Sequence, residues 1–340
     1  VSGEVHLIYF DFVATFTVLM LAGRYLHLAA AERARAAQAT MIFAEGDDPR
    51  VAKAAAQAAR EGIADIESIM TRNALIEIAE AVHEIGGYFY CDGANFNAIV
   101  GKVRPGDLGV DAMHINLHKT FSTPHGGGGP GAGPVVLSEA LAPFAPLPYV
   151  VAGEETFDLV EHEVEGGSSF GRMTAFHGQM GMFVRALAYM MSHGSDGLAK
   201  IAEDSVLNAN YVLASLKDVM TASFDGPCMH EALFDDRFLK DTGVSTLDFS
   251  KAMIDEGYHP MTMYFPLVVH GAMLIEPTET ESKQSVDQFI GMMRHLVEKA
   301  KSGELERFTG APFNAPLKRL DETGAARNPV LRWTSEDGSD

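Results

Sequence analysis

Cysteine and positive charge are both scarce in this sequence, and each shortage argues against a class of function. The 340 residues include two cysteines, Cys91 and Cys228, with neither CxxC nor Cys/His zinc spacing. Such usage is typical of a reducing compartment, so we expect a cytoplasmic protein without a disulfide framework or a metal site. Lysine and arginine number 26 against 46 acidic residues, which gives a net charge of −20. General attraction to a phosphate backbone is therefore disfavoured, and we expect no nucleic-acid partner.

Long hydrophobic runs are scarce as well, with one exception near the start of the chain. The stretch from Leu7 to Ala31 is apolar enough to resemble a membrane helix. Asp11 and Arg24 leave only twelve uncharged residues between them, whereas a span needs roughly 20. A buried helix and a true span both stay open for this run, and for the protein as a whole we expect no membrane association.

The composition that is present predicts a globular protein of more than one domain. Hydrophobic residues make up 47% of the chain and charged residues 21%, which suits a large buried core. The residue composition and the hydrophobic pattern change along the chain. It divides into an amino-terminal segment (1–67), a region of alternating strands and helices (68–150), a helix-rich region with a small terminal domain (151–333) and a tail (334–340).

Two apolar strands of the second region are followed by polar residues. NALIEIAEAVHEIGG has helical spacing and ends at paired glycines, and YFYCDGAN then resembles a buried strand that ends at Asp92. VDAMHINLHK has a strand-like core and ends at Lys119, 27 residues after Asp92. Strands that alternate with helices and end in polar groups predict an α/β sheet with its ligand site along the carboxyl edge.

The third region changes to long amphipathic helices. FHGQMGMFVRALAYMMSHG and LAKIAEDSVLNANYVLASLKDV have helical spacing, and a further helix is expected over about 282–301. Short strands are expected near 227–233 and 264–269. This pattern indicates a passage from a large domain to a smaller terminal domain.

Asp92 and Lys119 together suggest pyridoxal 5′-phosphate (PLP) chemistry. A PLP enzyme needs a lysine that binds the cofactor covalently and an acid that keeps its ring nitrogen charged. On adjacent parallel strands, the ends that carry Asp92 and Lys119 could meet over one ring. Taken singly, the aspartate also suits a turn or helix cap, and the lysine also suits an exposed surface.

The residues around Lys119 strengthen this interpretation. His118 and His125 flank the turn and either stack on a cofactor, donate to it or relay protons, or serve as hydrogen-bonded turn residues. We expect a catalytic role for His118 and a cofactor-binding role for His125. Asn95 either donates to the phenolate of the cofactor ring or stabilises its own turn. Glycine allows the backbone to approach a ligand closely, although a flexible hinge is the alternative. Four consecutive glycines follow the turn, namely Gly126, Gly127, Gly128 and Gly129.

The stretch YCDGANFNAIVGKVRPGDLGVDAMHINLHKTFSTPHGGGGPGAGPV resembles the glycine dehydrogenase (decarboxylating) family, the P-protein of the glycine cleavage system. It most resembles the carboxyl-terminal subunit of the two-subunit bacterial type. The resemblance covers about residues 69 to 333, and it continues through SVLNANYVLASLKD, PCMHE, YHPMTMYFPLVV, LIEPTETESK and PVLRW.

This resemblance implies the fold of type I PLP-dependent transferases (aspartate-aminotransferase-like), with a partial large domain over 68–150 and an α+β small domain at the carboxyl end. Lys119 matches the cofactor lysine, Asp92 matches the ring-nitrogen aspartate and Ala94 would lie against the ring face. The implied reaction is glycine decarboxylation with transfer of an aminomethyl group to the lipoyl arm of the H-protein, whose channel the four glycines would border. The implied partner is the amino-terminal (alpha) subunit.

The start of the chain departs from that family. The first half of the family's large domain, including its phosphate-binding turn, is expected to be missing. Residues 8–35 instead resemble a membrane-helix region of heavy-metal P-type ATPases, and MIFAEGDDPRVAKAAAQAAREGIA resembles the start of a phosphate acetyltransferase domain. A chimeric start of this kind leaves a second hypothesis open, in which the chain is a catalytically inactive fragment that still associates with the companion subunit.

Overall fold

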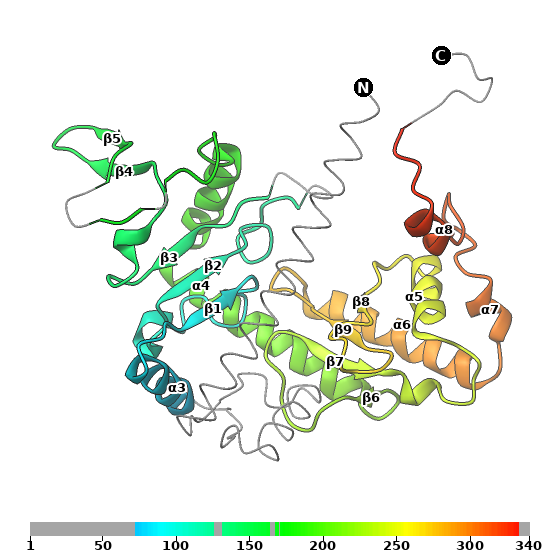
Figure 1. The fold of residues 1–340 in the computed structure, drawn as a ribbon. Helices are drawn as coiled ribbons and strands as arrows, with labels where there is room; N and C mark the ends of the chain where they lie inside the picture. Colours follow the sequence, from blue (N-terminus) through cyan, green and yellow to red (C-terminus); the bar gives the residue numbers. More distant parts are fainter. Residues whose placement is uncertain (1–71, 126–130, 164–166, 170, 333–340) are drawn as a thin grey trace, which may run out of the picture. The chain divides into compact units, whose positions relative to one another are not determined.

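The computed structural model describes residues 72–125, 131–163, 167–169 and 171–332. These residues fall into two compact units. The described residues of the first unit lie within 72–95 and 103–187, and those of the second lie within 96–102 and 188–332. Figure 1 shows the elements of both units in chain order. The domain bounds expected from the sequence stay a prediction, and the predictions for residues 1–67 and 334–340 lie outside the described residues.

A three-stranded mixed sheet forms the centre of the first unit. Strand β1 (Tyr90–Gly93) pairs in parallel with β2 (Ala112–Ile115), and β2 pairs antiparallel with β3 (Val135–Leu137). A separate antiparallel hairpin joins β4 (Tyr149–Ala152) to β5 (Phe157–Val160). The prediction that the strand ending at Asp92 lies beside the next strand of the chain, and parallel to it, is confirmed.

Helix α3 (Arg72–Glu84) precedes β1 and ends where the sequence predicts. Gly86 has a φ of 75°, and its N–H donates to the carbonyl of His83, a left-handed turn that glycine adopts without strain. The expectation that β1 is buried is wrong. Tyr90 is 55% exposed, and of the four residues of β1 only Gly93 is buried.

Asp111, just before β2, is the main polar anchor of the first unit. Its carboxylate is only 9% exposed and accepts the backbone N–H of Phe89 at 2.8 Å. His83 Nε2 lies 2.6 Å away, and the Ser138 hydroxyl donates to the other oxygen at 3.2 Å. These bonds tie α3, β1 and the segment after β3 to one carboxylate, and a buried carboxylate is stable only when it is bonded in this way.

We expect Asp111→Asn to destabilise the first unit by roughly 1–3 kcal/mol, since it leaves buried donors without their acceptor. The N–H of Phe89 is the largest cause that lowers the pKa of Asp111. Because the folded-state pKa lies below the unfolded value of about 3.9, the stabilisation is complete above that pH and is lost as the pH falls through the folded-state pKa. Denaturant unfolding at several pH values measures both effects.

The exposed Asp158 of β5 gives a matched control for this prediction. Asp158→Asn should change the unfolding free energy by less than about 0.5 kcal/mol. Equal effects of the two substitutions would show that the Asp111 network contributes nothing beyond an ordinary surface charge.

The second unit is an antiparallel sheet covered by helices. Its strands lie in the order β6-β7-β9-β8. Helix α4 (Met180–Leu216) runs from the first unit into the second, with a non-helical residue at Gly194, where the sequence predicts that one helix ends. The other elements are β6 (Thr221–Ala222), β7 (Ala232–Asp235), α5 (Thr246–Asp255), β8 (Thr262–Met263), β9 (Met273–Ile275), α6 (Lys283–Lys301), α7 (Leu305–Thr309) and α8 (Glu322–Arg327).

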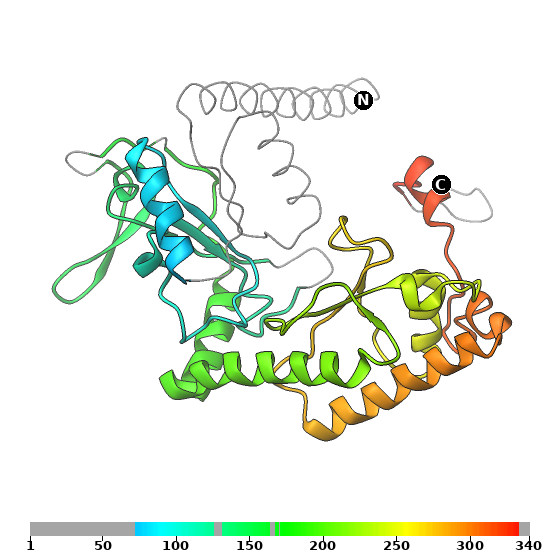
Figure 2. The same ribbon diagram turned by 90° about the horizontal axis from the view of Figure 1, so that it is seen from below.

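The carboxyl-terminal part of α4 lies beside α6, as Figure 2 shows. Arg294 of α6 donates to the Asp218 carboxylate at 2.6 and 2.7 Å, and the Tyr211 hydroxyl of α4 donates to Asp287 at 2.6 Å. Phe249 of α5 is fully buried in the core beneath the sheet. Apolar burial of this extent is the dominant stabilising contribution to such a unit.

The predicted strand over residues 264–269 is wrong. These residues form turns, and the strands β8 and β9 lie on either side of them. Phe265 and Leu267 are both exposed, and Pro266 has no N–H for a strand ladder. An apolar run alone therefore suggested a strand where the chain reverses direction. The helix predicted over about 282–301 is confirmed by α6.

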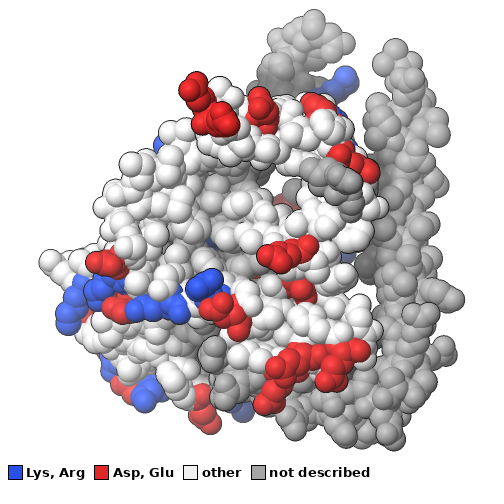
Figure 3. Space-filling model, turned by 90° about the vertical axis from the view of Figure 1, so that its left-hand side faces the viewer, with Lys and Arg blue, Asp and Glu red and all other residues white. Residues whose placement is uncertain are grey.

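Acidic side chains are spread over the face of the protein that Figure 3 shows, and the basic side chains in view gather mainly in one area beside acidic ones. This distribution agrees with the net charge of −20. Among the helices of the described residues, none combines the length and apolarity that a bilayer crossing requires. The apolar run from Leu7 to Ala31 lies outside those residues.

Candidate functional site at the ends of two parallel strands

The parallel pairing of β1 and β2 fixes where the candidate site lies. In its register Asp92 stands opposite His114, and Gly93 stands opposite Ile115. Both strands then end, and Lys119 follows β2 in a turn. The carboxyl ends of parallel strands lie at one edge of a sheet, so the edge that holds Asp92 is the edge from which the Lys119 turn leaves.

The Asp92 carboxylate is held by its own turn and by the neighbouring strand. Its Oδ1 accepts the N–H of Ala94 at 2.9 Å and lies 3.2 Å from His114 Nε2. The side chain is nevertheless 72% exposed. Gly93 permits this close strand pairing, because a Cβ atom there would overlap the His114 carbonyl oxygen and the Met113 side chain. The strand end thus presents a carboxylate that is accessible and oriented.

Lys119 lies on a tight turn that hydrogen bonds hold together. Its N–H donates to the Asn116 carbonyl at 3.3 Å, and the N–H of Thr123 donates to the Leu117 carbonyl at 3.2 Å. Lys119 is exposed while Leu117 and Thr123 are buried. The turn therefore anchors itself through its flanking residues and leaves the lysine amine at the surface.

His118 and His125 meet across the same turn. Their rings pack edge to face with centroids 4.8 Å apart. Burial lowers the pKa of His118, and the neighbouring His125 and Lys119 lower this pKa further. His118 is therefore neutral near pH 7, in the form that can accept a proton. Its Nδ1 is buried and has no hydrogen-bond partner among the described residues.

For the other predicted site residues the structure shows fewer contacts or none. Ala94 contributes its N–H to Asp92, and Asn95 follows directly at the boundary of the first unit. Their contacts to a cofactor ring stay predictions. The predicted channel loop stays a prediction too, because its four glycines all lie outside the described residues: Gly126, Gly127, Gly128 and Gly129.

Sequence reasoning missed two residues that contact the Asp92 carboxylate or its partner. His114 lies beside Asp92, and the Tyr90 hydroxyl forms a hydrogen bond with His114 Nδ1. Only the strand register reveals this grouping. The signal that could have found it is the period of two within β1, which puts Tyr90 and Asp92 on the same face of the sheet.

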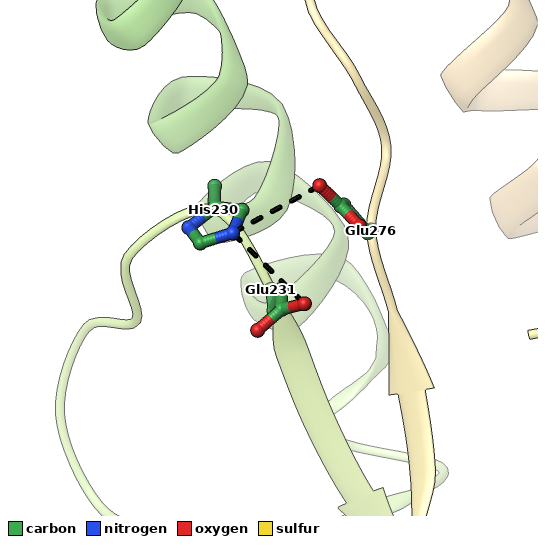
Figure 4. Close-up of side chains that lie close together, drawn as sticks. All are labelled: His230, Glu231 and Glu276. Atoms are coloured by element: carbon green, nitrogen blue, oxygen red, sulfur yellow. Dashed lines mark ion pairs between the residues drawn. The ribbon is translucent and has the colours of Figure 1, made fainter. Parts of the chain in front are cut away.

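A second polar cluster lies in the second unit, at the start of β7 and the end of β9. His230 Nε2 is 3.9 Å from a Glu231 oxygen and 3.8 Å from a Glu276 oxygen (Figure 4). Asn97 donates to that same Glu276 oxygen at 3.3 Å. Histidine and carboxylates are residue types that also bind cations. Here they form an ion-paired cluster to which sequence reasoning gave no role of its own.

Comparison with solved structures defines the class of fold. The chain is similar to the crystal structure of glycine decarboxylase (P-protein) of the glycine cleavage system in inhibitor-bound form, with a TM-score of 0.55 and 17% identity. The match covers 78% of this chain and 67% of that one. The predicted fold class is confirmed: the described units form the carboxyl-terminal portion of a type I PLP-dependent fold.

The sequence comparisons are more specific. Residues 201–316 match the family model described as glycine dehydrogenase, C-terminal domain. The chain is 72% identical over 262 residues to the probable glycine dehydrogenase (decarboxylating) subunit 2 of Caulobacter vibrioides, covering 76% of this chain and 50% of the relative. The same protein of Kosmotoga olearia is 48% identical over 260 residues, covering 76% of this chain and 53% of the relative.

These matches confirm the predicted resemblance to glycine dehydrogenase subunit 2. The chain spans about half the length of the curated relatives that it matches. The resemblances expected for residues 1–67 concern a part of the chain that the structure does not describe, and they stay predictions.

Proposed function

We propose that this chain acts in PLP-dependent glycine decarboxylation as a subunit 2 of glycine dehydrogenase, with the cofactor bound covalently to Lys119. The observation that carries the proposal is the register of β1 and β2, which brings Asp92 to the sheet edge that the Lys119 turn follows. The 72% identity to a relative named for this activity supports it. The use of PLP as the cofactor is part of this proposal, and so is association with partner proteins.

The residues of the site fit a cofactor of this kind. The Lys119 amine is exposed, and the contacts of the Asp92 carboxylate use Oδ1, which leaves Oδ2 to accept from a ring N–H. The turn also contains two buried polar atoms, His118 Nδ1 and Thr123 Oγ1, that have no hydrogen-bond partner among the described residues. Buried polar atoms are normally bonded, so these two favour a polar ligand beside the turn.

Each residue then has a definite task. When bound, PLP supplies an electron sink for the electron pair that loss of the glycine carboxylate leaves behind. Lys119 would hold the cofactor, Asp92 would keep its ring nitrogen protonated, and Ala94 would lie against the ring. Asn95 would donate to the ring oxygen, and His118, neutral because burial lowers its pKa, would move a proton at the substrate carbon.

Partners follow from the same proposal. The four glycines at 126–129 would border the channel for the lipoyl arm of an H-protein, and His125 would contact the cofactor. The hairpin β4–β5 exposes large apolar side chains, with Phe157 78% and Val150 64% exposed. Apolar groups gathered on one element favour a protein contact, and we assign it to the companion amino-terminal subunit. Two free cysteines support a cytoplasmic location.

Exchange of the glycine carboxylate with isotope-labelled bicarbonate tests the activity. The full chain, combined with its companion subunit and lipoylated H-protein, should catalyse this exchange. Asp92→Asn should slow it by roughly 100-fold, because an electrostatic partner of the developing charge is lost. Asp107→Asn, which alters an exposed aspartate of the same unit, is the control and should leave the rate unchanged.

The same experiment distinguishes this activity from the second hypothesis, in which the chain is catalytically inactive. Association with the companion subunit in the absence of exchange, for wild type as well as for Asp92→Asn, would identify the chain as an inactive fragment that keeps only its subunit contact.

A further inference from the structure

Three polar side chains form a continuous chain across β1 and β2. The Tyr90 hydroxyl is hydrogen bonded to His114 Nδ1, and His114 Nε2 lies 3.2 Å from Asp92 Oδ1. The Tyr90 and His114 rings are stacked, with centroids 5.9 Å apart and planes 20° from parallel. Asp92 and His114 are direct register partners, so the strand pairing itself brings the imidazole to the carboxylate.

The phenol O–H of Tyr90 and Nδ1 of His114 can each donate or accept, whereas an ionised carboxylate only accepts. We therefore assign the imidazole proton to the nitrogen nearest the Asp92 carboxylate, and the other nitrogen, Nδ1, then accepts from the Tyr90 hydroxyl. Nε2 is the nitrogen that faces Asp92 Oδ1. By donating to Nδ1, Tyr90 favours the tautomer that presents the Nε2–H of His114 to the carboxylate, in the way that partners of the second ring nitrogen orient metal-bound histidines.

We propose that His114 is a positioning residue for Asp92 and that Tyr90 sets its tautomer; the inference rests on the proposed function of Asp92. An aspartate that is 72% exposed would otherwise sample several rotamers. The Ala94 N–H, which donates to Oδ1, and His114 Nε2, which lies 3.2 Å from the same oxygen, restrict the carboxylate plane and leave Oδ2 for the ring nitrogen of the cofactor. Orientation of this kind contributes to binding by removing freedom before the ligand arrives.

A purely structural role makes different predictions. A cross-strand pair without any link to the cofactor would leave the PLP affinity unchanged, and its loss would not depend on which atom donates. A positioning role requires a donor at the Nε2 position, which a glutamine amide can supply and an alanine cannot. The two substitutions His114→Gln and His114→Ala therefore discriminate between the roles.

The experiment titrates the full chain, mixed with its companion subunit, with PLP and follows the visible absorbance band of the bound cofactor. His114→Ala should weaken PLP binding by about 10-fold, which corresponds to roughly 1.4 kcal/mol, and should shift the pH midpoint of the band. His114→Gln should restore the affinity to within about threefold of wild type, since its amide donates as Nε2 does.

Two further variants complete the set. Tyr90→Phe should weaken PLP binding by a few-fold, because the tautomer is no longer fixed. His162→Ala changes an exposed histidine of the same unit and should leave the affinity and the pH midpoint unchanged. Circular dichroism of each variant checks that the fold is retained.

The outcomes separate the inference from the proposed function. Suppose that the wild type shows a Lys119-dependent band and that His114→Ala binds PLP as tightly as the wild type. This result would overturn the inference and leave the proposed function intact. Equal losses for His114→Gln and His114→Ala in folded protein would also overturn it, because a donor would then not be what matters. Absence of any Lys119-dependent band in wild type would overturn the proposed function and the inference together.

Discussion

Replacing Lys119 by alanine is expected to abolish the visible absorbance band of bound PLP and to lower glycine–bicarbonate exchange by more than about 1,000-fold. Alanine has no amine, so the cofactor loses its covalent attachment and the group that returns it to the resting state. The fold should persist, because Lys119 is exposed and its turn is anchored by the buried Leu117 and Thr123. Absorbance spectra and the exchange assay measure the two effects.

An exposed lysine of the second unit serves as the matched control. Lys283 of α6 pairs with Asp287, with Nζ and Oδ2 2.7 Å apart, and has no place in the proposed site. Lys283→Ala should keep the band and the exchange rate, which separates one specific lysine from the general reactivity of exposed amines towards an aldehyde. A wild-type band in Lys119→Ala protein would show that the cofactor lysine is misassigned.

The second large effect concerns the core of the terminal unit. Phe249→Ala should destabilise this unit by about 3–5 kcal/mol, through lost burial and the cavity left behind. Phe249 is fully buried, and its ring meets Phe238 edge to face at 5.7 Å and Phe308 in a stack at 6.1 Å. Denaturant unfolding followed by circular dichroism measures the change, which should appear in the transition of this unit.

Phe157→Ala is the matched control, because it makes the same substitution at an exposed position. Phe157 is 78% exposed on β5, so its truncation should change the unfolding free energy by less than about 0.5 kcal/mol. Comparable losses for both substitutions would mean that the α5 core contributes no more than a surface position does.

The strand pairing beside the candidate site could be predicted from local sequence because strand ends leave a local signal. Asp92 and Lys119 each follow an apolar stretch, and the register confirms that these two stretches are neighbouring parallel strands, while the roles of the two residues stay predictions. The ends of α3 and α6 were predictable for the same reason, since glycine after a helix and serine before one act on neighbouring residues.

What could not be predicted depends on contacts between distant residues. His114 meets Asp92 only through the register of two strands, and His230 meets Glu276 only after β7 pairs with β9. Periodicity describes one element at a time and gives no register. The turn over residues 264–269 was missed in a related way: its apolar side chains resemble those of a buried strand, although Phe265 and Leu267 are exposed.

Gly93 links the geometry of the sheet to the chemistry of its edge. Its hydrogen atom occupies the space that a methyl group would need beside the His114 carbonyl oxygen, a backbone atom that cannot move without carrying β2 with it. The spacing between the strand of the aspartate and the strand of the lysine is thus set by a residue that itself performs no chemistry. Any side chain at this position would therefore move the strand that leads to the lysine turn, whatever its own chemistry.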